Sequence, residues 1–416
     1  MPLLGSIGGG SSKGFGAQAN LNYLIRNSLR FRSSASAYLN RTPTVAGNQQ
    51  KFTWSGWIKR GSDFGSQSEF FTAGTSSTNY ITFQFDASNR LTLGSETPSL
   101  VCNLRTTSVY RDPAAWYHVV LAVDTTQATA ANRVKLYVNG NQISAFDTST
   151  YPTQNTNLLV NSVIAHYFAK NTSGGGYFDG YLSDVYFIDG QQLDPYYFGS
   201  NDENNIWKPI KYYGMYGTNG FHLDFTNTTS TTTIGYDSSP NGNNWTANNI
   251  SLTAGTTYDA MTDVPTNTSA TQANYAVMNP LWKGSTISIV DGNLKVTESS
   301  SSGSGANSTI SVSSGKYYWE VTVLGVEGGN SYPRIGVGAT IEQTAGNTFL
   351  MALGWRPDGT VSAGGSSYIT VNGSPGGTTF TTNDIIQVAL DMDNKDRKST
   401  RLNSSHIPLS RMPSSA

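Results

Sequence analysis

The sequence predicts an all-β protein made of two tandem antiparallel β-sandwiches. Three observations lead to this prediction. Apolar and polar residues alternate in short runs along most of the chain, which is the period of a half-buried strand. Gly, Ser, Thr and Asn separate these runs, and aromatic residues reach 12%, a mixture that favours strands and turns over helices. A chain of 416 residues is also long enough for two hydrophobic cores of ordinary size.

The composition excludes several classes of protein. A net charge of -1 at pH 7 gives no field that would attract nucleic acid or an anionic membrane, so neither is expected as a partner. No stretch is apolar enough for a membrane span, and we expect no signal peptide, because the N-terminus lacks a basic start and an apolar run. The single cysteine, Cys102, cannot form an internal disulfide and is expected to be a buried apolar residue.

The first predicted module covers residues 26–200 and follows a Gly-rich N-terminal segment, 1–25. Around Trp54 and Trp57 the alternation places one tryptophan on each face of a strand. Asn139-Gly140 predicts a tight hairpin, because both residues tolerate positive φ. The same alternation predicts further antiparallel strands in the runs 81–85, 117–123, 134–138 and 178–187.

Four motifs of this module resemble the laminin G-like, concanavalin A-like lectin family in their order and spacing. They are Trp54-Ser-Gly-Trp57-Ile-Lys, Trp116-Tyr-His-Val-Val, Val134-Lys-Leu-Tyr-Val-Asn-Gly140 and Phe178-Asp-Gly-Tyr-Leu-Ser-Asp184. The resemblance implies a jelly roll of two packed antiparallel sheets, an architecture that is used to recognise sugars and proteins.

Some members of that family hold a calcium ion, which makes calcium the one cofactor that the resemblance suggests. Asp124, Asp179 and Asp184 are the candidate ligands, because they lie at strand ends and supply hard oxygen atoms. The alternative, which we favour, is that each aspartate ends a strand and turns the chain.

Aromatic side chains at the loops of such a sandwich can stack on sugar rings. Trp57, Tyr110, Tyr167 and Tyr177 are therefore the candidate ligand contacts, and the competing interpretation is that they are core residues, as most strand tryptophans are. His118 lies in a strand interior between aromatic residues and valines, and we expect a hydrogen-bonded structural histidine there.

Residues 201–275 are rich in Asn, Thr and Ser and carry few charges. Phe221, Leu223 and Phe225 alternate, and Trp245 follows a Pro-Asn-Gly turn, so short strands are expected to continue through this region. The region is predicted to be an ordered connector, not a flexible linker.

The second predicted module covers residues 276–395 and has a shorter set of motifs. Gly315-Lys-Tyr-Tyr-Trp-Glu-Val321, Arg334-Ile-Gly-Val-Gly338, Leu353-Gly-Trp355 and Val388-Ala-Leu-Asp-Met-Asp-Asn394 resemble the SPRY family in its order. That family consists of protein-interaction sandwiches whose loops form the binding face and which have no catalytic machinery. In the family a turn and a further apolar strand follow the residues that match Val388 to Asp393.

Residues 396–416 differ sharply from what precedes them: they are basic, free of aromatics and without alternation. Read back through the genetic code, Asp396–His406 and Ser410–Ala416 resemble the two constant parts of a translated sequencing-library adapter. The alternative is an ordinary disordered basic tail. We exclude this segment from the predicted fold, and so expect the second module to be incomplete by about one strand.

The sequence predicts binding without catalysis. The glutamates stand apart, and no nucleophile elbow, phosphate-binding loop or Cys/His metal spacing occurs, so no catalytic residue is assigned. The order of segments resembles virion-associated, tail-fibre-like proteins of marine bacteriophages, which implies a tail location and contacts with a host-surface glycan or protein, other virion proteins and further copies of the chain. The alternatives are a purely structural virion component and a polysaccharide-acting glycoside hydrolase or lyase.

Overall fold

The computed structural model of the chain describes residues 23–269, 271–299, 305–326, 333–338, 353–359, 361–362, 379–394 and 396–402. Within these ranges the protein is built from antiparallel strands, and its one α-helix is the single turn α2 (Ala130–Arg133). The predicted all-β class is confirmed. None of the described helical segments is long and apolar enough to cross a membrane.

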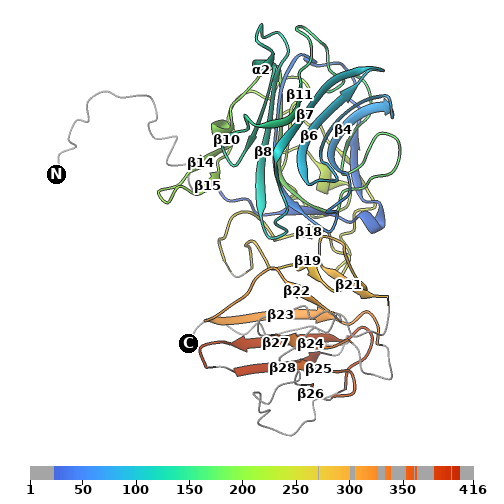
Figure 1. The fold of residues 1–416 in the computed structure, drawn as a ribbon, viewed down its shortest axis with the longest axis vertical. Coiled ribbons are helices and arrows are strands. Elements are labelled where there is room, and N and C mark those ends of the chain that lie inside the picture. Colours follow the sequence, from blue (N-terminus) through green and yellow to red (C-terminus); the bar gives the residue numbers. More distant parts are fainter. Residues whose placement is uncertain are drawn as a thin grey trace, which may run out of the picture. The chain divides into compact units, whose positions relative to one another are not determined.

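The chain divides into two compact units (Figure 1). The first unit comprises Met1–Val277 and Val290–Lys295, and the second comprises Met278–Ile289 and Val296–Ala416. The first unit contains two eight-stranded antiparallel sheets, which we call the first sheet and the second sheet, and the two-stranded pair β14 (Gly199–Asn201) and β15 (Trp207–Pro209).

The first sheet has the strand order β10-β9-β8-β3-β13-β1-β18, and β16 pairs with β13. Its strands are β1 (Ser28–Phe31), β3 (Lys51–Arg60), β8 (Trp116–Asp124), β9 (Val134–Val138), β10 (Asn141–Gln142), β13 (Gly180–Asp189), β16 (Phe221–Leu223) and β18 (Ala260–Met261). The second sheet has the order β11-β7-β6-β5-β4-β12-β2-β17. Its strands are β2 (Tyr38–Arg41), β4 (Ser68–Ser76), β5 (Asn79–Phe85), β6 (Arg90–Glu96), β7 (Leu100–Val109), β11 (Phe146–Thr150), β12 (His166–Phe168) and β17 (Thr246–Asn248).

The two sheets pack face to face around one aromatic core. The ring of Trp54 on β3 lies 5.6 Å from the rings of Phe70 on β4 and Phe83 on β5, measured between centroids. Trp57 points to the opposite face of β3 and is buried there in a smaller cluster that includes Trp116. The prediction that each face of this strand carries a tryptophan is therefore confirmed, and both faces are covered.

The predicted hairpin at Asn139-Gly140 is also confirmed. Asn139 has φ of 48° and Gly140 has φ of 79°, the left-handed conformation that this turn requires. Val138 of β9 and Asn141 of β10 are paired on either side of the turn.

The region 201–275 adds strands to both sheets of the first unit. β16 pairs with β13 and β18 pairs with β1 in the first sheet, while β17 pairs with β2 in the second. The ring of Trp245, just before β17, lies 4.5 Å from Phe168 and 5.2 Å from Phe221, so this region also contributes to the core. The short strands predicted near Phe221 and Trp245 are thus present, and they complete the sandwich.

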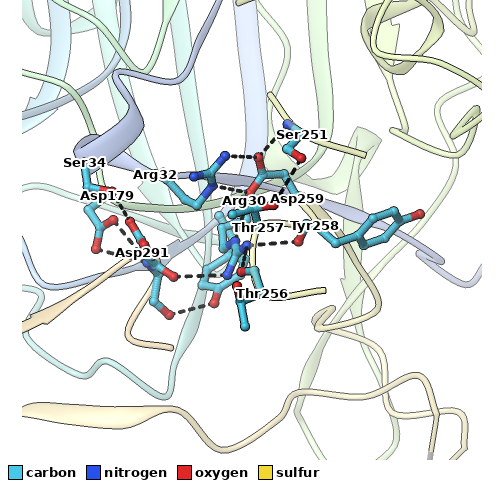
Figure 2. Close-up of polar contacts among 12 residues, drawn as sticks. Arg30, Arg32, Ser34, Asp179, Ser251, Thr256, Thr257, Tyr258, Asp259 and Asp291 are labelled. Carbon is cyan, nitrogen blue, oxygen red and sulfur yellow. Dashed lines mark hydrogen bonds and ion pairs between the residues drawn. The ribbon is translucent and has the colours of Figure 1, made fainter. Parts of the chain in front are cut away.

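A buried ionic network ties this region to β1 (Figure 2). The carboxylate of Asp259 accepts hydrogen bonds from Arg30 Nε at 3.0 Å, Arg32 Nε at 2.8 Å and Arg32 Nη2 at 3.0 Å, and from the backbone N–H of Ser251 at 2.8 Å. Arg30 also donates to the carbonyl oxygens of Thr256 and Tyr258. Both guanidinium groups are almost completely buried, so their charges depend on these acceptors.

The second unit contains two three-stranded sheets among its described residues. The first has the order β23-β27-β28 and the second β24-β25-β26, and β19 pairs with β22 and β20 with β21. The strands are β19 (Met278–Lys283), β20 (Ile287–Val290), β21 (Lys295–Glu298), β22 (Ala306–Ser308), β23 (Lys316–Thr322), β24 (Ile335–Val337), β25 (Leu353–Trp355), β26 (Val361–Ser362), β27 (Ile385–Asp391) and β28 (Asp396–Leu402). Its core consists of Val323, Ile335, Trp355, Phe380, Ile386 and Val388.

The start of the C-terminal segment differs from the sequence expectation. We excluded residues 396–416 from the fold, but β28 pairs with β27 along its whole length, from Asp396 opposite Asp391 to Leu402 opposite Ile385. The free edge of β27 offers unpaired backbone N–H and C=O groups, and any extended segment can satisfy them whatever its side chains. The resemblance to a translated adapter stays a prediction, and the nucleotide sequence around the codon of Asp396 tests it.

Candidate binding site

The outer face of the second sheet carries a line of residues, one from each strand, and all of them except Gly94 have polar side chains. Successive members are direct partners in the strand register, so the line crosses the whole sheet. From β11 to β17 the members of this polar row are Thr150, Asn103, Gly94, Thr82, Thr72, Tyr167, Asn40 and Thr246. The row is about 34 Å long, because neighbouring strands lie about 4.8 Å apart.

The row faces away from the core because strand residues alternate between the two faces of a sheet. Its members are flanked along their strands by core residues such as Phe71, Phe83, Leu93 and Cys102. The side chains of the row offer amides and hydroxyls, which both donate and accept hydrogen bonds. Thr72 and Thr82 are buried, and the hydroxyl of Thr72 donates to the carbonyl oxygen of Lys170 at 2.8 Å. The side chains of the row that reach the solvent are Thr150, Asn103, Tyr167, Asn40 and Thr246.

An aromatic cluster lies where the row crosses β12 and β2, and we call it the tyrosine cluster. It consists of Tyr38, Tyr167 and Tyr177, with the ring of Tyr38 at 6.2 Å from each of the other two. The ammonium group of Lys170 lies 4.4 Å from the ring centroid of Tyr38 and 5.0 Å from that of Tyr167, which is cation–π geometry. All four side chains are partly exposed, so the cluster presents aromatic surface to the solvent.

The structure brings together two of the four predicted ligand contacts. Tyr167 and Tyr177 lie in the tyrosine cluster, whereas Trp57 and Tyr110 are buried, Tyr110 with its ring 5.4 Å from that of Tyr117. Sequence reasoning did not select Tyr38 or Lys170. The alternation of Tyr38 with buried Leu39 would indicate an outward side chain, but nothing in the sequence shows that β2 lies beside β12.

Glu69 lies next to the cluster, paired with the chain segment that carries Tyr177. Glu69 and Tyr177 form a β-bridge, and Glu69 is 6% exposed. Its Oε2 atom accepts no hydrogen bond within the described structure. Burial raises the pKa of Glu69 to about 7, because the charged form loses its hydration.

We expect the stability of the first unit to fall between pH 5 and pH 8 because of Glu69. The unfolded chain releases this proton near the ordinary value of 4.5, but the folded protein releases it only near 7. The free energy of unfolding is therefore highest below about pH 4.5. It falls by roughly 3 kcal/mol as the pH rises through about 7, because the folded protein must then hold a buried charge. Urea unfolding of the wild type and of Glu69→Gln at pH 5 and pH 8 measures it. Glu69→Gln should be more stable than the wild type at pH 8 but not at pH 5. If the two proteins differ in stability by the same amount at both pH values, Glu69 is not the group that causes the pH dependence.

The three aspartates proposed as calcium ligands accept hydrogen bonds from different parts of the chain. Asp179 accepts hydrogen bonds from the backbone N–H groups of Ser62 and Gly292, and Asp124 accepts from Thr126 and Gln127. Asp184 accepts hydrogen bonds from the hydroxyl of Tyr23 and from Nε2 of His222, each at 2.7 Å. Among the described residues no group of three or more His, Cys, Asp or Glu side chains could hold a metal ion. Asp124 lies at the end of β8 and Asp179 directly before β13, as the alternative interpretation expects, whereas Asp184 lies inside β13. Calcium binding stays a prediction.

His118 has a structural environment, although it lies beside a serine. Its Nε2 atom is 2.9 Å from Ser55 Oγ, and Trp207 Nε1 donates a hydrogen bond to its Nδ1 atom at 3.0 Å. Since the indole N–H only donates, Nδ1 carries no proton, so the proton of the neutral ring is on Nε2 and points to Ser55. Burial lowers the pKa of His118 to about 3. In this arrangement the histidine cannot take a proton from the serine.

Comparison with known proteins supports the fold of the first unit. Residues 32–193 match a laminin G family model, which is described as the concanavalin A-like lectin/glucanases superfamily. This part of the chain is thus similar to that family, and the predicted sandwich of the first module is confirmed. No curated protein matches the chain.

Several solved structures are similar to the chain. A heptameric SAP-like pentraxin from Limulus polyphemus is 17% identical, with 41% of this chain and 79% of the pentraxin covered and a TM-score of 0.31. Domain 4 of an extracellular arabinanase from Geobacillus stearothermophilus, in complex with arabinotriose, is 17% identical, with coverage of 37% and 66% and a TM-score of 0.28. The CBM40 of a Ruminococcus gnavus sialidase, bound to α2,3-sialyllactose, is 12% identical, with coverage of 33% and 73% and a TM-score of 0.25.

Proposed function

We propose that the first unit is a non-enzymatic binding module that holds a glycan across the outer face of its second sheet. The observation that carries this proposal is the partly exposed tyrosine cluster, which lies beside the accessible row members Tyr167, Asn40 and Thr246 on β12, β2 and β17. A glycan chain has hydroxyl groups along its whole length, so it suits a line of amides and hydroxyls. The exposed tyrosine rings suit the apolar faces of sugar rings.

The absence of carboxylates from the polar row supports binding without hydrolysis. A glycoside hydrolase needs two carboxyl groups on either side of the scissile bond, and no member of the row is acidic. Glu69, a carboxyl group paired with the segment that carries Tyr177, is buried. A reducing-sugar assay on host polysaccharides tests this part of the proposal, and sugar release by the purified protein would refute it.

The wider proposal places this module on a virion, where it recognises a glycan or a protein on the host surface. It rests on the resemblance of the segment order to tail-fibre-like proteins. The second unit is then a SPRY-like interaction module. The support for it is general: β23 and β27 are antiparallel, and Trp355, Ile335 and Val388 share an apolar core, as in any β-sandwich. Wild-type protein that binds no glycan and no component of host extracts would favour the purely structural alternative.

A glycan array with substituted proteins tests the proposed site. Tyr38→Ala and Tyr167→Ala should each weaken binding at least ten-fold, because each removes a stacking ring worth about 1.4 kcal/mol. Tyr213→Ala is the matched control: this tyrosine is 71% exposed and also lies near a lysine, with Lys211 Nζ 5.8 Å from its ring, but it is not a member of the row or the cluster. The site is wrongly assigned if all three variants bind like the wild type.

A further inference from the structure

A recess lies on the outer face of the first sheet, where the chain after β13 passes β8 and β9. It has a volume of about 250 Å³ and is lined by Ala122, Lys135, Tyr137, Gln192, Asp194 and Tyr197. Ala122 and Lys135 are direct partners in the register of β8 and β9, and Tyr137 is the next outward residue along β9. The small side chain of Ala122 leaves the space that the neighbouring longer side chains surround.

Two side chains around the recess, Gln192 and Asp194, are held in place by hydrogen bonds. Gln192 Nε2 donates to the carbonyl oxygens of Ala122 at 3.3 Å and Asn132 at 2.9 Å. Asp194 is the N-cap of the short 3-10 helix η2 (Pro195–Tyr197), and its Oδ1 atom accepts from the backbone N–H of Tyr196 at 2.9 Å. The recess therefore exists before any ligand arrives, which reduces the entropy cost of binding.

Three polar groups around the recess are free to bind a ligand. The ammonium group of Lys135, the hydroxyl of Tyr137 and the Oδ2 atom of Asp194 make no hydrogen bond or ion pair within the described part of the chain. Burial and the nearby charge of Asp194 raise the pKa of Tyr137, so its hydroxyl keeps its proton and can donate. The ring of Tyr197 is 50% exposed and adds an apolar wall.

The charges around the recess argue against a free ion as its ligand, and the size of the recess argues for a small one. Asp194 repels a free anion and Lys135 repels a free cation, so neither an inorganic anion nor a metal ion suits both groups. A neutral polyol satisfies both, because each hydroxyl donates to a carboxylate or accepts from an ammonium group. Drug-sized ligands occupy pockets of about 300 Å³ or more, so a recess of about 250 Å³ suits one small ring.

We propose that this recess binds a single neutral sugar ring, with Asp194, Lys135 and Tyr137 holding its hydroxyl groups and Tyr197 lying against its apolar face. The site is on the opposite sheet from the polar row, so it goes beyond the function proposed above and does not depend on it. Two separate contacts would let the first unit hold two sugar units at once and would raise its avidity for a dense glycan surface.

Saturation-transfer NMR on the full chain tests the recess with methyl glycosides of glucose, galactose, mannose and N-acetylglucosamine at millimolar concentration. We expect at least one glycoside to receive saturation. Asp194→Asn should weaken its binding about ten-fold, because it removes the charge but keeps an oxygen for the backbone of Tyr196. Tyr137→Phe should weaken binding several-fold and keeps the buried ring.

The measurement is made in a Tyr38→Ala/Tyr167→Ala background, so that the tyrosine cluster does not contribute to the signal, and Tyr213→Ala added to this background is the control that should leave the signal unchanged. If Asp194→Asn does not reduce the signal in this background, the glycoside does not bind in the recess and the proposal is overturned. An absence of saturation transfer to all four glycosides also overturns the proposal. Failure of the recess leaves the glycan-array result intact, so the two proposals are tested separately.

Discussion

Replacing Asp259 with alanine is expected to lower the free energy of unfolding of the first unit by about 3 to 5 kcal/mol. Asp259 is completely buried and is the shared acceptor of Arg30 and Arg32 (Figure 2). Without it two buried guanidinium groups lose their counter-charge, and the backbone N–H of Ser251 loses its acceptor. Urea unfolding followed by tryptophan fluorescence measures the loss, since Trp54 and Trp245 lie in the core of the same unit.

Asp147→Ala is the matched control for this substitution. Asp147 also accepts from two arginines, Arg90 at 3.0 Å and Arg105, but its side chain is 40% exposed. Water stabilises the arginines when this carboxylate is removed, so the expected loss is below about 1 kcal/mol. Equal losses for the two variants would show that burial of the Asp259 network does not contribute to stability.

The sequence was sufficient to predict the main strands of the first unit. In β3, β8 and β9 the alternation is long enough to identify both faces, and the Asn139-Gly140 turn requires a conformation that few other pairs adopt. The buried and structural role of His118 also followed from its position between apolar residues in a strand. These predictions succeed because the residues of each strand or turn are enough to indicate its conformation.

Features that depend on distant segments could not be predicted. A short strand is expected near Trp245, but β17 has only three residues, and nothing near it in the sequence indicates that it pairs with β2, about 200 residues earlier. The tyrosine cluster exists only because β2 and β12 are neighbours. Likewise, nothing near Asp259 in the sequence indicates that an arginine of β1 and the arginine that follows this strand meet there.

Lys59 and Asp263 form a second buried ion pair, and we expect each single substitution there to be costly. Lys59 Nζ lies 2.7 Å from Asp263 Oδ2, and its other partners are Asn274 Oδ1 at 2.8 Å and the carbonyl of Tyr275 at 2.9 Å. Burial lowers the pKa of Lys59 and raises the pKa of Asp263, so each charge depends on the other. Lys59→Met should therefore cost about 3 to 5 kcal/mol, because it leaves the carboxylate buried without its counter-charge.

The double variant Lys59→Met/Asp263→Asn is expected to recover at least about 2 kcal/mol of the summed single losses. It removes both charges together, and the amide oxygen introduced at position 263 would still accept from Trp116 Nε1, which in the wild type donates to Asp263 at 3.0 Å. Unfolding free energies of the four proteins in the cycle give the coupling directly. Additive losses would mean that the two charges do not stabilise each other, and that Lys59 is held mainly by its neutral partners Asn274 and Tyr275.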